Sequence, residues 1–265
     1  MGYGTIGRMQ RLTHGEMAYY QFESLLSPGL KHGVFTRLGG VSEGCYHSLN
    51  LSRSTGDTAE AVTENRRRMY AALSAQAERA VTSWLVHGNT VRVITEEDLG
   101  QNDVHADAMV TDRRGVALTL RFADCVPVLF HDPAREVIGI AHAGWLGIEC
   151  GVLPATVRAM TSAYGCRPRD IRACIGPSIG PDKFEVGEDV AARIQSAVRE
   201  PVILAGNGKP RVDLWKAARS QLHDAGVGNI EIAGLCTASN TLEWFSHRAE
   251  KGKTGRFGAL IELAG

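Results

Sequence analysis

The stretch FADCVPVLFHDPAREVIGIAHAGW, residues 122–145, decides the fold, because two apolar runs in it flank a short polar segment. The Val, Ile and Phe residues of both runs are typical of β-strands. Asp at the first position and Pro at the second position of segment 132–135 favour a type I turn. A hairpin closed by that turn pairs Cys125 directly with His142, with their Cβ atoms about 4.5 to 5.5 Å apart.

Three interpretations of Cys125 and His142 are open at this point. They are packed core residues, a nucleophile and its base, or two ligands of one metal ion. Alternation along the strand places Asp124 on the face opposite Cys125, so its carboxylate is expected either to have a structural role or to support the site residues from behind. The residues around His142 are small and leave room for a ligand: Gly139, Ala141, Ala143 and Gly144.

A second hairpin is predicted over residues 81–95, VTSWLVHGNTVRVIT, because two β-rich runs flank His-Gly-Asn-Thr. This hairpin places His87 at or beside its turn. A helix is predicted from Asp57 to about Leu73, with Asp57 as the N-cap and Glu60 three residues later in a capping-box spacing.

Hairpins occupy the middle of the chain and helices flank them, so we expect mixed sheets with outer helices rather than a uniformly parallel sheet. No segment resembles a linker, and a single domain is the simplest arrangement. Further helices are predicted at 149–164, 187–198 and 214–225, and further strands near 33–37 and at 171–175, 229–235 and 257–263.

Composition indicates a globular protein that acts on a small or neutral partner. The 265 residues carry no formal net charge, and 44% of them are hydrophobic, so the basic footprint of a nucleic-acid-binding protein is missing. The N-terminus lacks the apolar core of a secretion signal, and no apolar run approaches the length of a membrane span. Six cysteines are scattered without a CxxC pair, which suits reduced thiols. We therefore expect a cytoplasmic protein that contacts neither nucleic acid nor membrane.

Ten motifs in order give the chain a resemblance that covers nearly its whole length. They are FTRLGGVSEG, SLNLS, GDTAEAVTENR, VHG, ADAMVTD, ADCVPVLFHDP, AHAGW, IGPSIG, FEVGEDV and FSHRAEKGKTGR. The chain resembles the laccase-domain family, also called multicopper polyphenol oxidases and associated with purine nucleoside phosphorylase and adenosine deaminase activities. The resemblance implies an α+β fold of two mixed β-sheets packed face to face with helices outside, which makes four layers in a single domain. The expected boundaries are an N-terminal extension at 1–20 and the family domain at 21–265.

The resemblance also implies a metal site formed by the motif residues His87, Cys125 and His142, which are the expected catalytic residues. Two imidazoles and one thiolate leave a fourth tetrahedral position open, as in catalytic zinc sites. We expect Zn2+ rather than copper, because none of the nine histidines forms the HxH pair that a multicopper oxidase needs.

The expected reactions are phosphorolysis of adenosine, inosine, guanosine and methylthioadenosine, and hydrolytic deamination of adenosine. The expected partners are purine nucleosides and phosphate, the expected assembly is a monomer, and Arg37, Asn50, Asp107 and Arg248 are candidates for substrate binding. Two alternatives remain open: an editing hydrolase for peptidoglycan precursors, and a metal-free hydrolase that uses Cys125 and His142 as nucleophile and base.

The chain departs from the family pattern at three places close to these motifs. Leu146 follows the HAGW motif where the family commonly has Arg or Lys, WLVHG stands where glutamines commonly precede VHG, and Ala249 replaces a second arginine. If the usual charge at position 146 holds an anion, its loss weakens phosphate binding. If position 146 instead packs in the next helix, phosphate binding is unaffected.

Overall fold

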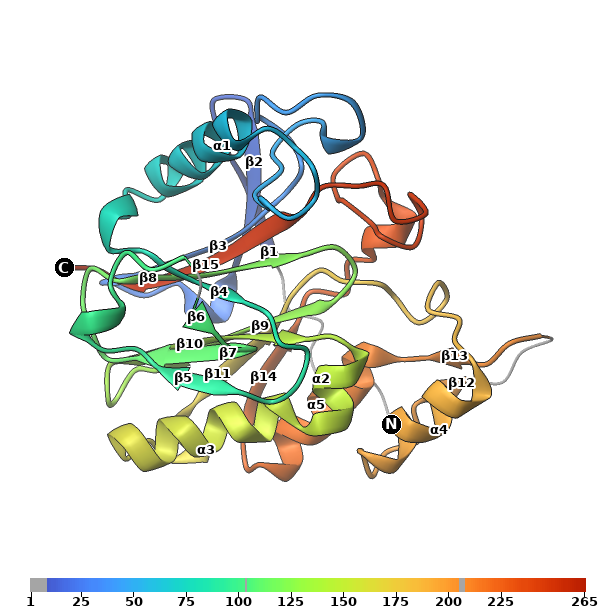
Figure 1. Ribbon diagram of the computed structural model, residues 1–265. Coiled ribbons are helices and arrows are strands. Elements are labelled where there is room, and N and C mark those ends of the chain that lie inside the picture. Colours follow the sequence, from blue (N-terminus) through green and yellow to red (C-terminus); the bar gives the residue numbers. More distant parts are fainter. Residues whose placement is uncertain (1–8, 103, 205–207) are drawn as a thin grey trace.

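The computed structural model describes residues 9–102, 104–204 and 208–265, which form two large mixed sheets (Figure 1). The larger sheet has the order β1-β2-β3-β15-β8-β4-β6, and the smaller has the order β14-β11-β9-β10-β7-β5. The larger sheet contains β1 Met9–His14, β2 Met17–Phe22, β3 Leu30–Phe35, β15 Phe257–Leu263, β8 Ala117–Phe122, β4 Val81–Trp84 and β6 Val104–His105. The smaller contains β14 Asn229–Ile232, β11 Arg172–Ile175, β9 Val126–Asp132, β10 Val137–Ala143, β7 Ala108–Thr111 and β5 Val91–Val93.

Helices cover the outer faces of both sheets. Helix α1 lies against the larger sheet, whereas α3 and α5 lie against the smaller one (Figure 1). The expected α+β fold, with two mixed sheets face to face and helices outside, is confirmed. The helices are α1 Ala59–Ala72, α2 Trp145–Cys150, α3 Val152–Tyr164, α4 Glu188–Ser196 and α5 Leu214–Asp224. A small β-ribbon, β12 Ile203–Leu204 with β13 Arg211–Val212, and 3₁₀ turns at Glu23–Leu25, Gly44–Tyr46, Ala77–Arg79, Glu96–Asp98, Pro168–Asp170 and Thr237–Ser239 complete the elements.

Side chains of β9 and β10 alternate between two apolar cores. Val126, Val128 and Phe130 of β9 pack toward the outer helices, whereas Leu129 packs between the sheets. On β10, Ile138 and Ile140 pack between the sheets, and His142 shares their face by the same alternation. The apolar pattern of the hairpin therefore directs His142 into the space between the two sheets.

The predicted hairpin forms, but its register differs from the prediction by two residues. The structure pairs Asp132 with Val137 and His142 with Pro127, so four residues, 133–136, form the turn. The Oδ1 of Asp132 accepts hydrogen bonds from the next backbone N–H groups, those of Ala134 and Arg135, at 2.9 and 3.1 Å. These bonds widen the predicted two-residue turn into a four-residue loop. An even shift leaves every side chain on its expected face.

The predicted hairpin around His87 is wrong. Strand β4 pairs in parallel with β8 of the larger sheet, whereas β5 pairs in parallel with β7 of the smaller sheet. Residues 85–90 therefore cross from one sheet to the other, and His87 lies on this crossover with a positive φ of 57°. The backbone N–H groups of the crossover bind a buried carboxylate instead of a hairpin partner.

The predicted helices are present with two local changes. The side chain of Thr58, not that of Asp57, caps α1 by accepting a hydrogen bond from the N–H of Ala61. The helix predicted over 149–164 is divided by Gly151, whose φ of 74° ends α2 before α3 begins. Within the expected N-terminal extension, residues 9–14 form β1 and residues 17–20 belong to β2, while residues 1–8 lie outside the described residues. The boundary at 20 stays a prediction. No helix in the described ranges is long and apolar enough to cross a membrane.

Two further histidines are buried in the sheets, one on β3 and the other on β9 beside the turn of the hairpin. His32 of β3 is fully buried and accepts a hydrogen bond from the Phe22 N–H at its Nε2, 2.9 Å away. His131 of β9 is 5% exposed. Burial lowers the pKa of each imidazole to about 4, from an ordinary value of 6.5. Both side chains are therefore neutral in the folded protein at neutral pH.

These histidines predict loss of stability in mild acid. Above about pH 6.5 neither the folded nor the unfolded chain protonates them, so stability is complete. As the pH falls from 6.5 toward 4, the unfolded chain binds protons first, and each histidine lowers the free energy of unfolding by up to about 1.4 kcal/mol per pH unit. Urea unfolding from pH 7 to pH 4.5 measures this, and His32→Gln, which can keep the bond to Phe22, should reduce the slope. An unchanged urea midpoint across this range would contradict the prediction.

Candidate functional site

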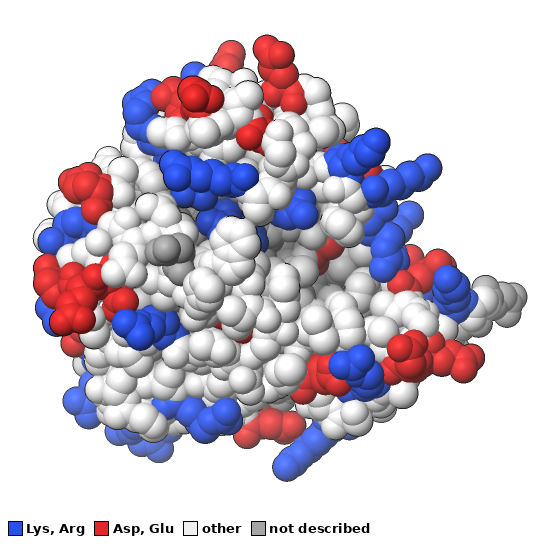
Figure 2. Space-filling model, viewed as in Figure 1, with Lys and Arg blue, Asp and Glu red and all other residues white. Residues whose placement is uncertain are grey.

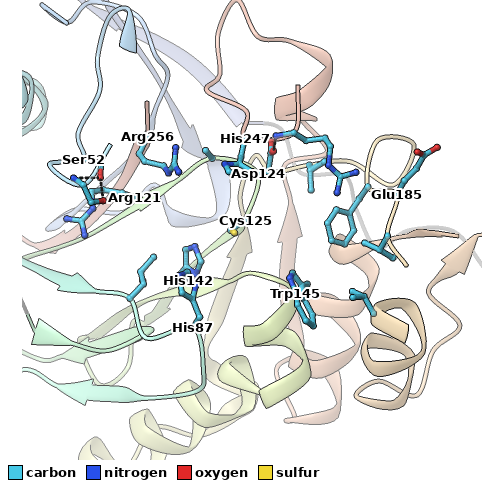
Figure 3. A pocket seen from close by; sticks show the side chains of 18 of the residues that line it. Ser52, His87, Arg121, Asp124, Cys125, His142, Trp145, Glu185, His247 and Arg256 are labelled. Carbon is cyan, nitrogen blue, oxygen red and sulfur yellow. Dashed lines mark hydrogen bonds between the residues drawn. The ribbon is translucent and has the colours of Figure 1, made fainter. Parts of the chain in front are cut away.

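A cavity of about 640 Å³ lies where the hairpin, the β4–β5 crossover and the C-terminal loops meet. His87, Cys125 and His142 all line it, although they come from separate parts of the chain. Figure 3 shows these side chains facing one space, with Arg121 and Arg256 on one side and Trp145 on the other. The structure therefore brings the three expected catalytic residues together.

Asp107 positions two of these residues through its buried carboxylate and its backbone. The carboxylate is fully buried and accepts hydrogen bonds from four backbone N–H groups of the crossover, those of Val86, His87, Gly88 and Thr90, at 2.7 to 3.3 Å. The carbonyl oxygen of Asp107 accepts the N–H of His142 at 2.8 Å. One residue thus fixes the backbone at both histidines.

The two imidazoles differ in their surroundings. His142 is 4% exposed and stacks on Phe122 with 5.3 Å between ring centroids, while His87 is exposed to the cavity. Their ring centroids are 5.8 Å apart in an edge-on arrangement. Burial, with the neighbouring His87, lowers the pKa of His142 to about 3. His142 therefore presents a neutral ring with a free nitrogen lone pair.

Cys125 lies directly before β9, beside Gly144 at the end of β10. A Cβ atom at position 144 would lie 3.1 Å from the Cys125 Sγ and 3.4 Å from His142 Cε1, so only glycine fits there without a shift. Burial and the Asp124 carboxylate raise the pKa of the Cys125 thiol to about 12. The thiol is therefore protonated unless a cation replaces its proton.

Asp124 has the structural role expected for it. Its Oδ1 accepts the Thr237 hydroxyl at 2.7 Å, and its Oδ2 accepts the backbone N–H of Arg248 at 2.7 Å. These bonds hold two C-terminal loops against the start of β9. Its φ of 83° breaks the strand directly before Cys125.

The donor atoms of His87, Cys125 and His142 suit zinc chemically. Zinc prefers thiolate and neutral imidazole, and two imidazoles on one tetrahedral zinc have ring centres roughly 5 Å apart, close to the observed spacing. As the side chains stand, however, no three His, Cys, Asp or Glu residues in the described part of the chain are arranged to hold a metal ion. Metal binding therefore stays a proposal that depends on the donor chemistry.

Three arginines line the cavity without a carboxylate partner within ion-pair distance among the described residues. Arg121 donates to the Thr82 hydroxyl and the Ser83 carbonyl, Arg256 donates to the carbonyls of residues 254 and 255, and Arg248 donates to the Lys183 carbonyl. Figure 2 shows Lys and Arg side chains gathered above the hollow in this view. Two carboxylates, Asp124 and Glu185, also line the cavity, so the three arginines leave it with an excess of positive charge that suits an anion.

Of the four residues expected to bind substrate, only Arg248 lines the cavity. Arg37 bonds the carbonyls of His47 and Thr241, forms an ion pair with Glu250 at 2.9 Å and stacks on Phe245. Asp107 is the buried anchor of the crossover. These contacts give both residues structural positions.

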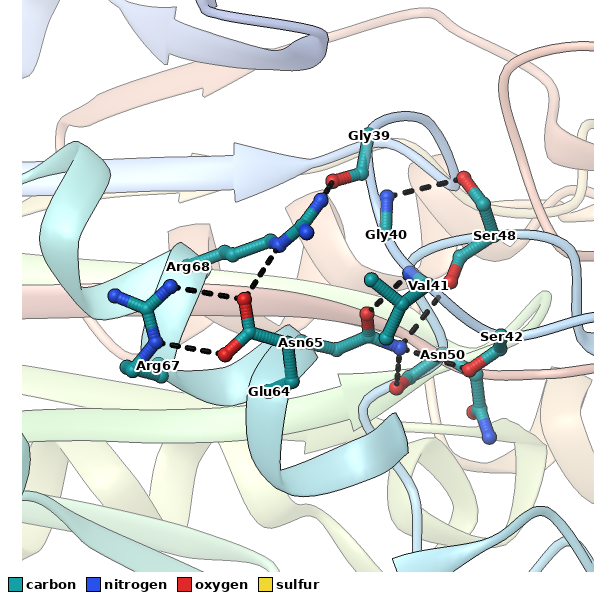
Figure 4. A network of polar contacts seen from close by, with 10 residues as sticks. All are labelled: Gly39, Gly40, Val41, Ser42, Ser48, Asn50, Glu64, Asn65, Arg67 and Arg68. Atoms are coloured by element: carbon teal, nitrogen blue, oxygen red, sulfur yellow. Dashed lines mark hydrogen bonds and ion pairs between the residues drawn. The ribbon is translucent and has the colours of Figure 1, made fainter. Parts of the chain in front are cut away.

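Asn50 is also fully buried and supports the site indirectly. Its Oδ1 accepts the backbone N–H of Arg256 at 2.9 Å, and its own carbonyl accepts a hydrogen bond from Asn65 of α1. Figure 4 shows Asn65 also bonding Val41, Ser42 and the Ser48 carbonyl. This network fixes the loop between β3 and α1 that reaches the cavity.

Sequence reasoning missed Arg121 and Arg256. Arg121 is a charged residue inside the apolar run of β8, which is a usable signal because an arginine in a buried strand needs a function or a partner. Arg256 directly precedes β15, which pairs with β8 so that Gly258 lies opposite Arg121. This pairing brings Arg256 to the same cavity as Arg121. Leu146, second in α2, is partly buried and does not line the cavity.

Comparison with known proteins gives the family. A family model described as multi-copper polyphenol oxidoreductase laccase matches residues 31–264. The chain belongs to this laccase-domain family. It is 40% identical to the purine nucleoside phosphorylase of Deinococcus radiodurans over 88% of each chain, and 37% identical to purine nucleoside phosphorylase YfiH of Escherichia coli over 86% of this chain and 91% of that protein. The crystal structure of YlmD from Geobacillus stearothermophilus superposes on this laccase-domain chain with a TM-score of 0.92 at 32% identity, covering 98% of this chain and 100% of that one.

The contacts of Asp107 predict that this laccase-domain site is sensitive to an isosteric change. Asp107→Asn replaces one accepting oxygen with an NH₂ group that faces backbone N–H donors, so we expect the free energy of unfolding to fall by about 2 to 4 kcal/mol. Urea unfolding measures the loss. Asp112→Asn, at an exposed aspartate, is the matched control. Equal stability of the two variants would contradict the anchoring role of Asp107.

Proposed function

We propose that this protein cleaves purine nucleosides by phosphorolysis in the cavity of His87, Cys125 and His142, and that the same cavity deaminates adenosine. The observation that carries the proposal is that Arg121, Arg248 and Arg256, none of them in an ion pair with a described residue, line the cavity beside those three side chains. Phosphorolysis needs a dianion held against the ribose, and guanidinium groups bind phosphate oxygens in pairs. The names of the relatives support the same reaction for this chain.

The chemistry assigns different tasks to the walls of the cavity. Phosphate attacks C1′ of the ribose while the bond from C1′ to the purine nitrogen breaks, and the departing base gains negative charge. Arg121 and Arg256 hold the phosphate on one wall. Trp145 provides an aromatic surface on the other wall, where a purine ring can stack, and Phe184 also lines the cavity.

The residues of the proposed zinc site are His87, Cys125 and His142. Bound zinc supplies a Lewis acid that activates water for attack on an electrophilic carbon such as C6 of adenosine. Asp107 holds the backbone of both histidines in place for this role. The substrates adenosine, inosine, guanosine and methylthioadenosine share the purine and the ribose that this cavity would bind.

A metal-free hydrolase with Cys125 as nucleophile fits the site less well. Such an enzyme needs a thiolate beside an imidazolium, and the thiolate is usually favoured by a lowered pKa. Here burial raises the pKa of Cys125 and lowers that of His142, which stabilises the two neutral forms. A bound cation would favour the thiolate without charging the imidazole.

A nucleoside panel tests the reaction directly. Purified protein incubated with adenosine, inosine or guanosine should release free base and a pentose phosphate only when phosphate is present. Adenosine should yield inosine with or without phosphate, because water is the nucleophile in that reaction. Product identification by chromatography checks both. Release of free base at equal rates without phosphate would show hydrolysis and contradict the phosphorylase proposal.

Metal content tests the proposed zinc site. The protein should purify with about one zinc per chain, and Cys125→Ala should lose the metal and the activity, because the only thiolate ligand of the site is gone. Cys45→Ala, which removes an exposed thiol, should retain both. Elemental analysis and the nucleoside assay give the two readouts. Full activity in metal-free Cys125→Ala protein would refute both the zinc site and the cysteine nucleophile.

A further inference from the structure

A second cavity, of about 500 Å³, adjoins the first one. Ser52, Ser54, Trp84 and Arg121 line both cavities and so form their shared wall. The second cavity also contains Arg53, so it extends from an exposed arginine to the wall of the main cavity. Its other lining residues are Arg66, Gly100, Gln101 and Asn102.

Three guanidinium groups meet in this second cavity without a carboxylate among its described lining residues. Arg53 contacts the Thr63 hydroxyl at 3.3 Å, and Arg66 donates to the Leu51 carbonyl at 3.0 Å and to the Asn102 side chain at 3.1 Å. Within the described part of the chain, the side chains of Arg53, Arg66 and Arg121 donate hydrogen bonds only to neutral oxygens. The positive charge therefore remains for a ligand.

The three charges act on one another. Burial lowers the pKa of Arg66, and the nearby Arg53 lowers it further. Burial lowers the pKa of Arg121 to about 10, and Arg66 adds to this effect. Like charges gathered in a partly buried cavity repel, and an anion between them relieves both the repulsion and the loss of hydration.

We infer that the second cavity binds a phosphate group and presents it to the main cavity at the wall that contains Arg121. A phosphate dianion offers enough oxygens to accept hydrogen bonds from several guanidinium groups at once, whereas a carboxylate offers two. The Ser52 and Ser54 hydroxyls bond each other at 3.0 Å and Asn102 donates one amide hydrogen to the Gly100 carbonyl, which leaves one hydroxyl and one amide hydrogen as further neutral donors in the lining. The group comes either from inorganic phosphate or from the phosphomonoester of a nucleotide.

Binding of phosphate in the second cavity does not depend on the proposed function. Only the use of that phosphate in phosphorolysis rests on it. Arginines arranged from solvent to the interior also attract anions along the cavity. Phosphate would then enter beside the nucleoside rather than through the same opening. If so, inorganic phosphate can bind before or after the nucleoside.

Calorimetric titration with inorganic phosphate, without nucleoside, tests the binding. We expect Arg53→Gln to weaken phosphate affinity about three- to fivefold, because its guanidinium is exposed, and Arg66→Gln to weaken it about tenfold or more. Arg199→Gln removes the same charge from a side chain that is 87% exposed and should bind like the wild type. Among the described residues the Arg53 side chain hydrogen-bonds only the Thr63 hydroxyl, so Arg53→Gln should fold normally. Equal phosphate affinity in Arg53→Gln, Arg66→Gln and Arg199→Gln would overturn the inference.

Two further arms identify the source of the phosphate group and separate the two proposals. Tighter binding of AMP than of adenosine, with the difference lost in Arg66→Gln, identifies a phosphomonoester as the occupant. Equal binding of AMP and adenosine, with inorganic phosphate binding as predicted, identifies inorganic phosphate. Phosphate binding without phosphorolysis of any purine nucleoside would contradict the proposed function alone. Phosphorolysis with a KM for phosphate that Arg53→Gln and Arg66→Gln leave unchanged would contradict this inference alone.

Discussion

The site depends on a buried carboxylate that accepts four backbone N–H groups. A charge without a cation in a protein interior is costly unless hydrogen bonds replace its hydration, and Asp107 receives these bonds from the crossover that contains His87. The same bonds provide acceptors for crossover N–H groups that do not pair with a β-strand. The same residue accepts the N–H of His142. The hydrogen bonds that the buried Asp107 carboxylate needs thus fix the path of the crossover between the sheets. Together with the bond from His142, they set the positions of both cavity histidines.

The arginines around the cavities differ from most other arginines of the described chain in having no ion-pair partner. Elsewhere in the described chain many arginines form ion pairs, such as Arg193 with Glu149 at 2.6 Å and Arg219 with Glu200 at 2.8 Å. Arg121 and Arg256 instead bond only neutral oxygens. The fold holds both guanidinium groups in place, and neither has a carboxylate within ion-pair distance among the described residues. This is the arrangement of an anion site that is organised before its ligand arrives.

The sequence was informative where local patterns determine structure. Alternation was enough to bring Cys125 and His142 to one end of a hairpin, because a register error of two residues does not change which face a side chain occupies. The crossover at His87 could not be predicted in this way, since β4 and β5 look like hairpin strands and their true partners, β8 and β7, are distant in the chain. Arg121 and Arg256 meet through the pairing of β8 with β15, which local patterns do not encode. His87 was identified by resemblance to a family and not by its own surroundings.

The position of β15 has a consequence for how the protein is made. This strand, Phe257–Leu263, lies between β3 and β8 in the interior of the larger sheet, although both partners come from much earlier in the chain. While the ribosome is still adding the residues of β15, β3 and β8 have unsatisfied edges facing each other across a missing strand. The larger sheet, and with it the wall that contains Arg121 and Arg256, can close only after that strand has emerged from the ribosome. Such long-range pairing slows folding, and it leaves the edges of β3 and β8 open to other chains until β15 has paired with both.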